Sequence, residues 1–135
     1  PRSGRMPVRN LSLQVREGEI VGIAGVEGNG QSDLIDVIAG MIPLNAGSIT
    51  LSGKEISRLT IRQRRLGGLS HIPEDRLKTG TSKVCTICEN LMLNKYFLSP
   101  FSKKGVFRHQ HVQQHSEELC RKFLVKTPDS SYELN

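Results

Sequence analysis

The sequence predicts an α/β fold, and three observations support that prediction. An apolar run at residues 20–24, IVGIA, has the length and character of a strand covered on both faces. The glycine-rich segment GVEGNGQS follows directly, and residues 33–39 then place apolar side chains at helical spacing. Strand-like and helix-like segments continue to alternate as far as residue 80, beyond which the pattern is helical. We therefore expect an incomplete parallel or mixed sheet with helices, followed by the start of a helical subdomain.

The remaining elements of the first half are predicted from alternation and turn residues. Residues 8–15 alternate apolar and polar side chains, as a half-buried strand does. Gly40 follows the helix at residues 33–39 and is suited to cap its carboxyl end. Residues 48–51 form a further strand, after which Gly53 turns the chain.

A short basic helix and a last strand complete the first half. Thr60 is placed to cap this helix, which ends near Leu66 before a pair of glycines. Residues 68–72 then predict a strand that Pro73 stops.

The second half is expected to be helical. Residues 86–94 and 106–125 carry helical patterning, separated by the loop FLSPFSKKG. The change of character near residue 80 predicts a boundary between a first part at 1–80, in which strands and helices alternate, and a helical part at 81–135.

Length and charge bound the class of protein. The chain of 135 residues suits one core, and no apolar run approaches the roughly 20 residues that span a bilayer. Lys and Arg number 19 against 13 Asp and Glu, which gives a net charge of +6. Such a surface suits nucleic acid, anionic lipid or phosphate ligands. Because no aromatic residues are interleaved with the basic ones as stacking platforms, we favour a solvated basic face.

The cysteines are interpreted as reduced thiols that pack as small hydrophobes. Two of them have CxxC spacing, which also occurs in zinc and redox sites. The histidines of the second half supply only a loose set of further zinc ligands. The residues concerned are Cys85, Cys88, Cys120, His109, His111 and His115.

The segment from Gly25 to Ser32 predicts a phosphate-binding loop. In the pattern G-x-x-x-x-G-K-[ST], glycines let the backbone wrap a phosphate, and the following helix turns its N–H groups and dipole toward the anion. Gly25, Gly30 and Ser32 fit the pattern, but Gln31 stands where the lysine belongs. Gln31 donates hydrogen bonds but carries no charge, which should weaken binding of the outer phosphate. The alternative is a glycine turn that only joins a strand to a helix.

Four segments, in order and at matching distances, resemble ABC-transporter ATPases. They are NLSLQVREGEIVGIAG leading into the loop, AGSITLSGKEI, HIPEDR and ENL. The PEDR block is typical of the second, carboxyl-terminal ATPase domain in importers of simple sugars and nucleosides. The GVEGNGQS loop is most similar to the nucleoside-importer branch, in which glutamine recurs at the lysine position. The resemblance covers residues 8 to about 128 and implies a P-loop NTPase fold, here as a fragment.

The resemblance implies ATP and Mg²⁺ as ligands, with Ser32 binding the metal. Glu74 occupies the place of the Q-loop glutamine; the plainer interpretation of Pro73 to Arg76 is a turn with an Asp–Arg surface pair. The implied nucleotide-binding residues are Gly25, Gly28, Asn29, Gly30, Gln31, Ser32 and Asp33.

The family's LSGGQ-like signature, magnesium aspartate, catalytic glutamate and switch histidine are expected beyond Asn135, and the aromatic residue that stacks on adenine before Pro1. We therefore expect a truncated piece that is inactive alone. Its apolar run at 20–24 would lack sheet neighbours and leave apolar surface bare, so we expect either self-association or a rearranged packing.

The resemblance also implies partners and location. The intact protein would use ATP to drive uptake of a nucleoside or simple sugar from the cytoplasmic face of the cell membrane. Its partners would be transmembrane permease subunits, the other ATPase domain and, indirectly, a solute-binding protein, but no nucleic acid. Alternatives are a non-hydrolysing regulatory half-site, a basic nucleic-acid-binding scaffold, and an ABC-type repair or translation factor without a membrane partner.

Overall fold

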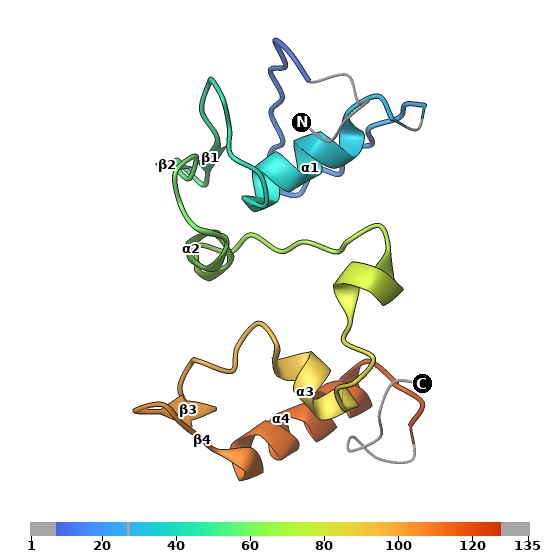
Figure 1. The fold of residues 1–135 in the computed structure, drawn as a ribbon, viewed down its shortest axis with the longest axis vertical. Helices are drawn as coiled ribbons and strands as arrows, with labels where there is room; N and C mark the ends of the chain where they lie inside the picture. Colours follow the sequence, from blue (N-terminus) through green and yellow to red (C-terminus); the bar gives the residue numbers. More distant parts are fainter. Residues whose placement is uncertain (1–7, 27, 128–135) are drawn as a thin grey trace. The chain divides into compact units, whose positions relative to one another are not determined.

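The computed structural model describes residues 8–26 and 28–127 (Figure 1). The chain divides into two compact units, of which the first ends at His71 and the second begins at Ile72. The helices and strands follow in the order α1 (Gln31–Ala39), β1 (Thr50–Leu51), β2 (Lys54–Glu55), α2 (Ile61–Leu66), the π-helical turn η1 (Arg76–Gly80), α3 (Ile87–Met92), β3 (Ser102–Lys103), β4 (Val106–Phe107) and α4 (His109–Lys122).

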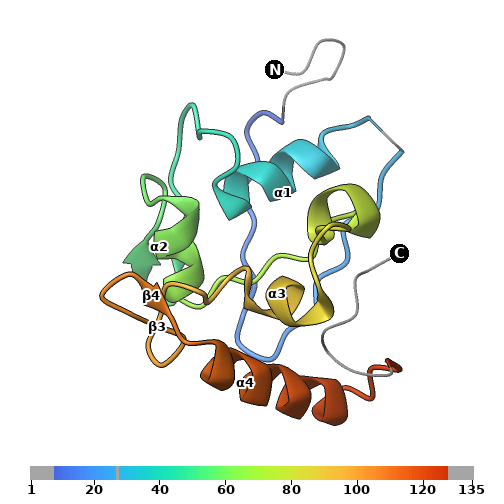
Figure 2. The ribbon, with the colours of Figure 1, turned by 60° about the horizontal axis from the view of Figure 1, so that its bottom comes forward.

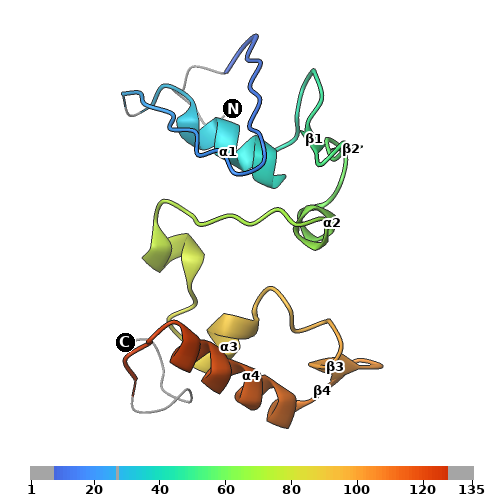
Figure 3. The same cartoon turned by 180° about the vertical axis from the view of Figure 1, so that it is seen from behind.

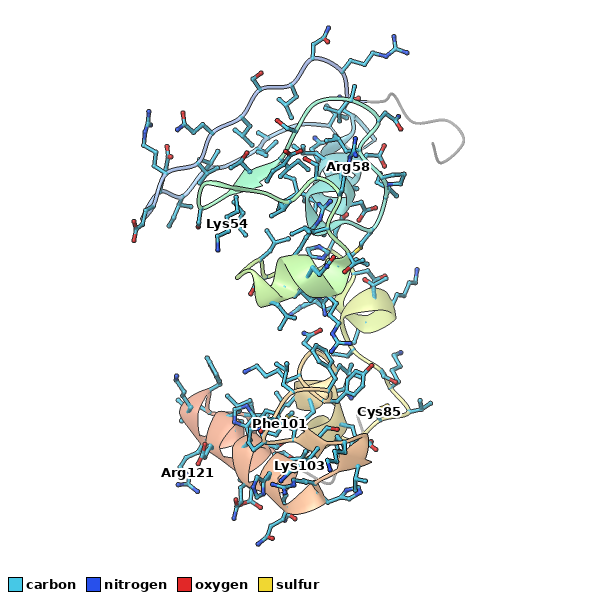
Figure 4. All side chains as sticks on the ribbon, turned by 90° about the vertical axis from the view of Figure 1, so that its left-hand side faces the viewer. Lys54, Arg58, Cys85, Phe101, Lys103 and Arg121 are labelled. Carbon is cyan, nitrogen blue, oxygen red and sulfur yellow. The ribbon has the colours of Figure 1, made fainter. Side chains whose placement is uncertain are left out.

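The first unit contains α1, the β1–β2 hairpin and α2. The two strands pair antiparallel, with Thr50 opposite Glu55 and Leu51 opposite Lys54. Lys54 and Arg58 are exposed on this unit (Figure 4). The expected helix at 33–39 and the strand at 48–51 are thus confirmed in position, although the strand is shorter than predicted.

Thr60 caps α2 as the sequence predicts. Its side-chain oxygen accepts from the Gln63 main-chain N–H, and the Gln63 side chain accepts from the Thr60 main-chain N–H. This reciprocal capping box satisfies two N–H groups that a helix start leaves without partners. It explains why a helix of one and a half turns forms in a segment rich in arginine.

Three predicted strands are wrong: residues 8–15, 20–24 and 68–72 form no strand. Strand hydrogen bonds are made to a neighbouring chain segment, so an alternating pattern alone does not complete a strand. Both sheets within the described ranges are antiparallel hairpins, and neither contains the expected parallel pairing. The bare apolar surface expected at 20–24 is confirmed, since the side chain of Ile20 is 97% exposed and that of Ile23 53%.

The second unit packs α3 against α4, which lie side by side in Figures 1 and 3. The β3–β4 hairpin leads directly into α4, whose full length is visible in Figure 2. Met92, Phe101 and Val112 are buried together, and the partly buried Cys88 and Phe107 pack against them. The helical character expected of this half is confirmed, but residues 106–107 belong to β4 rather than to the last helix.

Candidate functional site

The glycine-rich segment forms an exposed loop that turns directly into α1. The Asn29 main-chain N–H donates to the carbonyl of Val26 at 3.2 Å, which closes the loop. Gly30 precedes the helix with φ 95° and ψ 3°, a left-handed conformation that a residue with a β-carbon adopts at a cost. The positive end of the α1 dipole therefore lies at this loop, as an anion site requires.

Gln31 folds its side chain back over the loop. Its amide nitrogen Nε2 donates to the carbonyl of Val26, 3.4 Å away. A β-carbon built on Gly25 would coincide with that same nitrogen. A side chain at position 25 would therefore have to displace the amide of Gln31, the residue that replaces the usual lysine.

The structure brings the predicted nucleotide-binding residues into this one loop and the first turn of α1. Gly25, Gly28 and Asn29 are exposed, Gly30 is buried, and Gln31, Ser32 and Asp33 are half-buried. A β-carbon added to Gly28 would meet no atom within 4 Å, so open space borders the backbone there. An exposed, glycine-lined turn at a helix start fits a phosphate group, and the Ser32 hydroxyl is the type of ligand that Mg²⁺ accepts.

Glu74 lies in the second unit, whereas the loop lies in the first. Its side chain is exposed. The neighbouring Asp75 caps η1, because its Oδ1 accepts from the main-chain N–H groups of Leu77 at 3.1 Å and Lys78 at 2.9 Å. Asp75 also pairs with Lys78, with its Oδ2 3.7 Å from Nζ. Within the described ranges, the charged partner of Asp75 is therefore Lys78 and not the arginine of the expected Asp–Arg pair.

The cysteines are free thiols, all half-buried. Cys88 Sγ accepts a hydrogen bond from the hydroxyl of Ser116 at 3.2 Å, inside the second unit. The Cys85 main-chain N–H donates to the carbonyl of Ser82 at 3.2 Å and closes the turn before α3 (Figure 4). Among the residues the structure describes, no group of three or more His, Cys, Asp or Glu side chains is placed to hold a metal ion. Among the described residues, Cys85 and Cys88 are therefore not joined by further side chains that could complete a metal site.

Sequence reasoning missed Arg64 as a special residue. It was counted as one charge of a basic helix, yet it is buried and bonded to main-chain carbonyls of α1. The partners lie 26 and 27 positions earlier in the chain, so no local pattern identifies them.

A sequence model of the ABC transporter family matches residues 8–130. The chain belongs to the ABC transporter family. ABC ATPases are P-loop NTPases, and this family binds nucleotide. No helix within the described residues has the length and apolar character needed to cross a membrane.

Three curated relatives illustrate the similarity. The guanosine import ATP-binding protein NupO of Bacillus subtilis is 45% identical over 122 residues, covering 90% of this chain and 24% of the relative. The nucleoside import ATP-binding protein NupA of Lactococcus lactis is 39% identical over 123 residues, covering 91% and 24%. The glucose import ATP-binding protein TsgD13 of Haloferax volcanii is 34% identical over 117 residues, covering 87% and 21%.

The chain thus spans about a quarter of the length of these relatives. No solved structure matches it significantly.

Proposed function

We propose that the chain is the ATP-binding part of an ABC importer ATPase that drives uptake of a nucleoside or a simple sugar. The observation that carries the proposal is the exposed glycine loop that runs into α1 with Gln31 in the lysine position. The relatives with the highest identity named above are called guanosine and nucleoside import proteins, which favours a nucleoside.

In this proposal the main chain, rather than an ammonium group, holds the nucleotide. The main-chain N–H groups of Gly30, Gln31 and Ser32 bind the β-phosphate, and the Ser32 hydroxyl binds Mg²⁺. The Gln31 amide nitrogen carries two N–H groups, of which one donates to the Val26 carbonyl, and it can give a phosphate oxygen a hydrogen bond but no charge. A lower affinity for nucleotide suits a regulatory site that works beside a second site containing the usual lysine. The non-hydrolysing half-site is therefore the second candidate.

The position of this chain within a complete transporter is part of the same proposal. Residues 1–80 form the nucleotide-binding core, and residues 81–135 begin the helical subdomain. Coupling to transmembrane permease subunits runs through residues 74–105, beginning at Glu74 in the Q-loop position. The domain is the carboxyl-terminal ATPase domain, paired with a second one at the cytoplasmic face of the membrane. A solute-binding protein, an indirect partner, delivers solute to the permease subunits.

Equilibrium titration of the full-length protein with fluorescent ATP and Mg²⁺ tests the proposal. We expect saturable binding that Gln31→Lys tightens by about tenfold, because a new charge near the phosphates is worth on the order of 1–4 kcal/mol at a protein surface. Gln114→Lys, on the exposed side of α4, adds the same charge elsewhere and should change the affinity little. Absence of binding with both glutamine and lysine at position 31 would exclude a nucleotide site here.

A further inference from the structure

Arg64 is a buried cation in the first unit, with only 2% of its surface exposed. Among the described residues, it is the single charged side chain that is buried. Burying a guanidinium is costly unless its N–H groups find partners. Its surroundings therefore indicate why the position holds an arginine.

Four hydrogen bonds join the guanidinium to main-chain carbonyls. Nη1 donates to the carbonyls of Val37 and Ile38, both at 2.7 Å. Nη2 donates to the carbonyl of Ser57 at 2.7 Å, and Nε to that of Leu59 at 3.0 Å. The planar fork thus ties the last turn of α1 to the segment between the β1–β2 hairpin and α2.

The carboxyl end of α1 is well suited to this contact. A helix leaves its last carbonyl groups without helical partners, and its dipole favours a positive charge at that end. The chain also makes room for the guanidinium at Gly40, which follows the helix with φ 83°. A β-carbon on Gly40 would lie 3.0 Å from Arg64 Nε and 3.2 Å from Cδ.

The other end of α1 carries the glycine loop. A helix of nine residues is roughly 13 Å long, so a tilt of about 10° at the carboxyl end moves the amino end by roughly 2 Å. A binding constellation generally tolerates only about 0.5 Å of displacement. The contacts of Arg64 are therefore placed to decide where the loop amides point.

We propose that Arg64 is a positioning residue for the nucleotide: by fixing the carboxyl end of α1, it holds the phosphate loop at the amino end in its binding geometry. This inference rests on the proposed function, since it assigns the residue that prepares the same site. Arg64 itself contacts no ligand.

The test compares three variants of the full-length protein. Arg64→Met removes the charge and all donors but keeps a long apolar side chain, and Arg64→Lys keeps the charge without the fork. Arg65→Met, on the exposed side of α2, removes one charge from the adjacent position and is the matched control. Circular dichroism first identifies a temperature at which each variant is folded. The dissociation constants of Mg²⁺-ATP and AMP are then measured at that temperature.

We expect Arg64→Met to bind ATP about tenfold more weakly than the native protein, in the range that couplings through packed networks reach. The ATP affinity of Arg64→Lys should lie between those of the native protein and Arg64→Met. The ATP affinity of Arg65→Met should stay within about twofold of the native value. AMP lacks the β- and γ-phosphates, so its affinity should fall less, and the preference for ATP over AMP should shrink. A purely structural role would leave that preference unchanged.

A folded Arg64→Met that binds ATP like Arg65→Met, or that loses ATP and AMP affinity equally, overturns the positioning role. If Arg64→Met does not fold, a folded Arg64→Lys with unchanged ATP affinity overturns it as well. Absence of ATP binding in the native protein and in Gln31→Lys would remove the proposed function and this inference together. If the native protein binds ATP and the Arg64 variants bind it with the same affinity, the positioning role of Arg64 is refuted and the proposed function stands.

Discussion

The side-chain amide of Gln31 occupies the space that a β-carbon on Gly25 would need. The contact joins the first glycine of the loop to the residue that replaces the usual lysine, and the Gln31 amide is anchored there by the Val26 carbonyl. The two positions are therefore in contact, and the effect of a substitution at one should depend on the residue at the other.

The coupling predicts a non-additive pair of variants. Gly25→Ala should lower the free energy of unfolding by about 1 kcal/mol, because it displaces Gln31 from its hydrogen bond. In a Gln31→Ala background the same change should cost close to nothing, since the space is already empty. Urea unfolding of the two single variants and the double variant measures the coupling. If Gly25→Ala lowers the free energy of unfolding equally with Gln31 and with Ala at position 31, the contact between the two positions does not contribute to stability.

Ser32 is expected to make nucleotide binding depend on Mg²⁺. With the native residue, ATP should bind about tenfold more tightly in Mg²⁺ than in a chelator, and Ser32→Ala should abolish most of that ratio because it removes a metal ligand. Ser48→Ala, at an exposed position outside the loop, serves as the control. A Mg²⁺ ratio that survives in Ser32→Ala would contradict the assignment of this hydroxyl.

The start of α3 should respond to acid. The Thr86 main-chain N–H donates to the Glu89 carboxylate at 2.8 Å, and this bond, with a second from the Thr86 hydroxyl, holds the pKa of Glu89 below its ordinary value of 4.5. A lowered folded-state pKa contributes stability above the unfolded-state pKa, and that stability is lost as the pH falls through the folded-state pKa. Glu89→Gln should therefore be less stable than the native protein at neutral pH.

The difference between Glu89→Gln and the native protein should shrink as the pH falls below 4.5, because the native carboxyl then protonates. Urea unfolding at neutral and acidic pH measures this difference in the free energy of unfolding. Glu118→Gln, exposed on α4, removes the same charge without touching a helix cap and is the control. A difference that is constant over this pH range would refute the capping role of the charge.

The second unit depends on a small core, so its buried methionine should be costly to truncate. Met92 is 1% exposed and packs with Phe101 and Val112. Met92→Ala should destabilise the unit by about 2–5 kcal/mol, the range for buried large-to-small changes. Leu77→Ala, at a side chain that is 66% exposed, should cost far less. Chemical unfolding of both variants gives the comparison, and similar costs would show that the cluster is not the core of the unit.

The sequence predicted the elements that local chemistry determines. The predicted caps Gly40 and Thr60 are found at the end of α1 and the start of α2. Thr86 caps α3 through the same kind of local bond, although it was predicted only as part of the helix. Such contacts depend on neighbours in the chain and are visible as patterns.

Features that depend on distant segments were not predictable in the same way. The apolar runs at 8–15 and 20–24 have strand composition, but a strand also needs a partner, and none pairs with them in the described ranges. The role of Arg64 is set by carbonyls on another helix, so the residue looked like one more surface charge. The glycine loop was predicted because the spacing of its glycines before a helix is a local pattern.

Hydrogen exchange at the loop amides is the most direct test of the central claim that main-chain N–H groups hold the nucleotide. Mass spectrometry would follow a peptide spanning residues 25–33 in the full-length protein, with and without saturating Mg²⁺-ATP. We predict that ATP slows exchange in this peptide, because bound phosphate oxygens accept hydrogen bonds from these amides. Saturable ATP binding that leaves the exchange of this peptide unchanged would contradict the account.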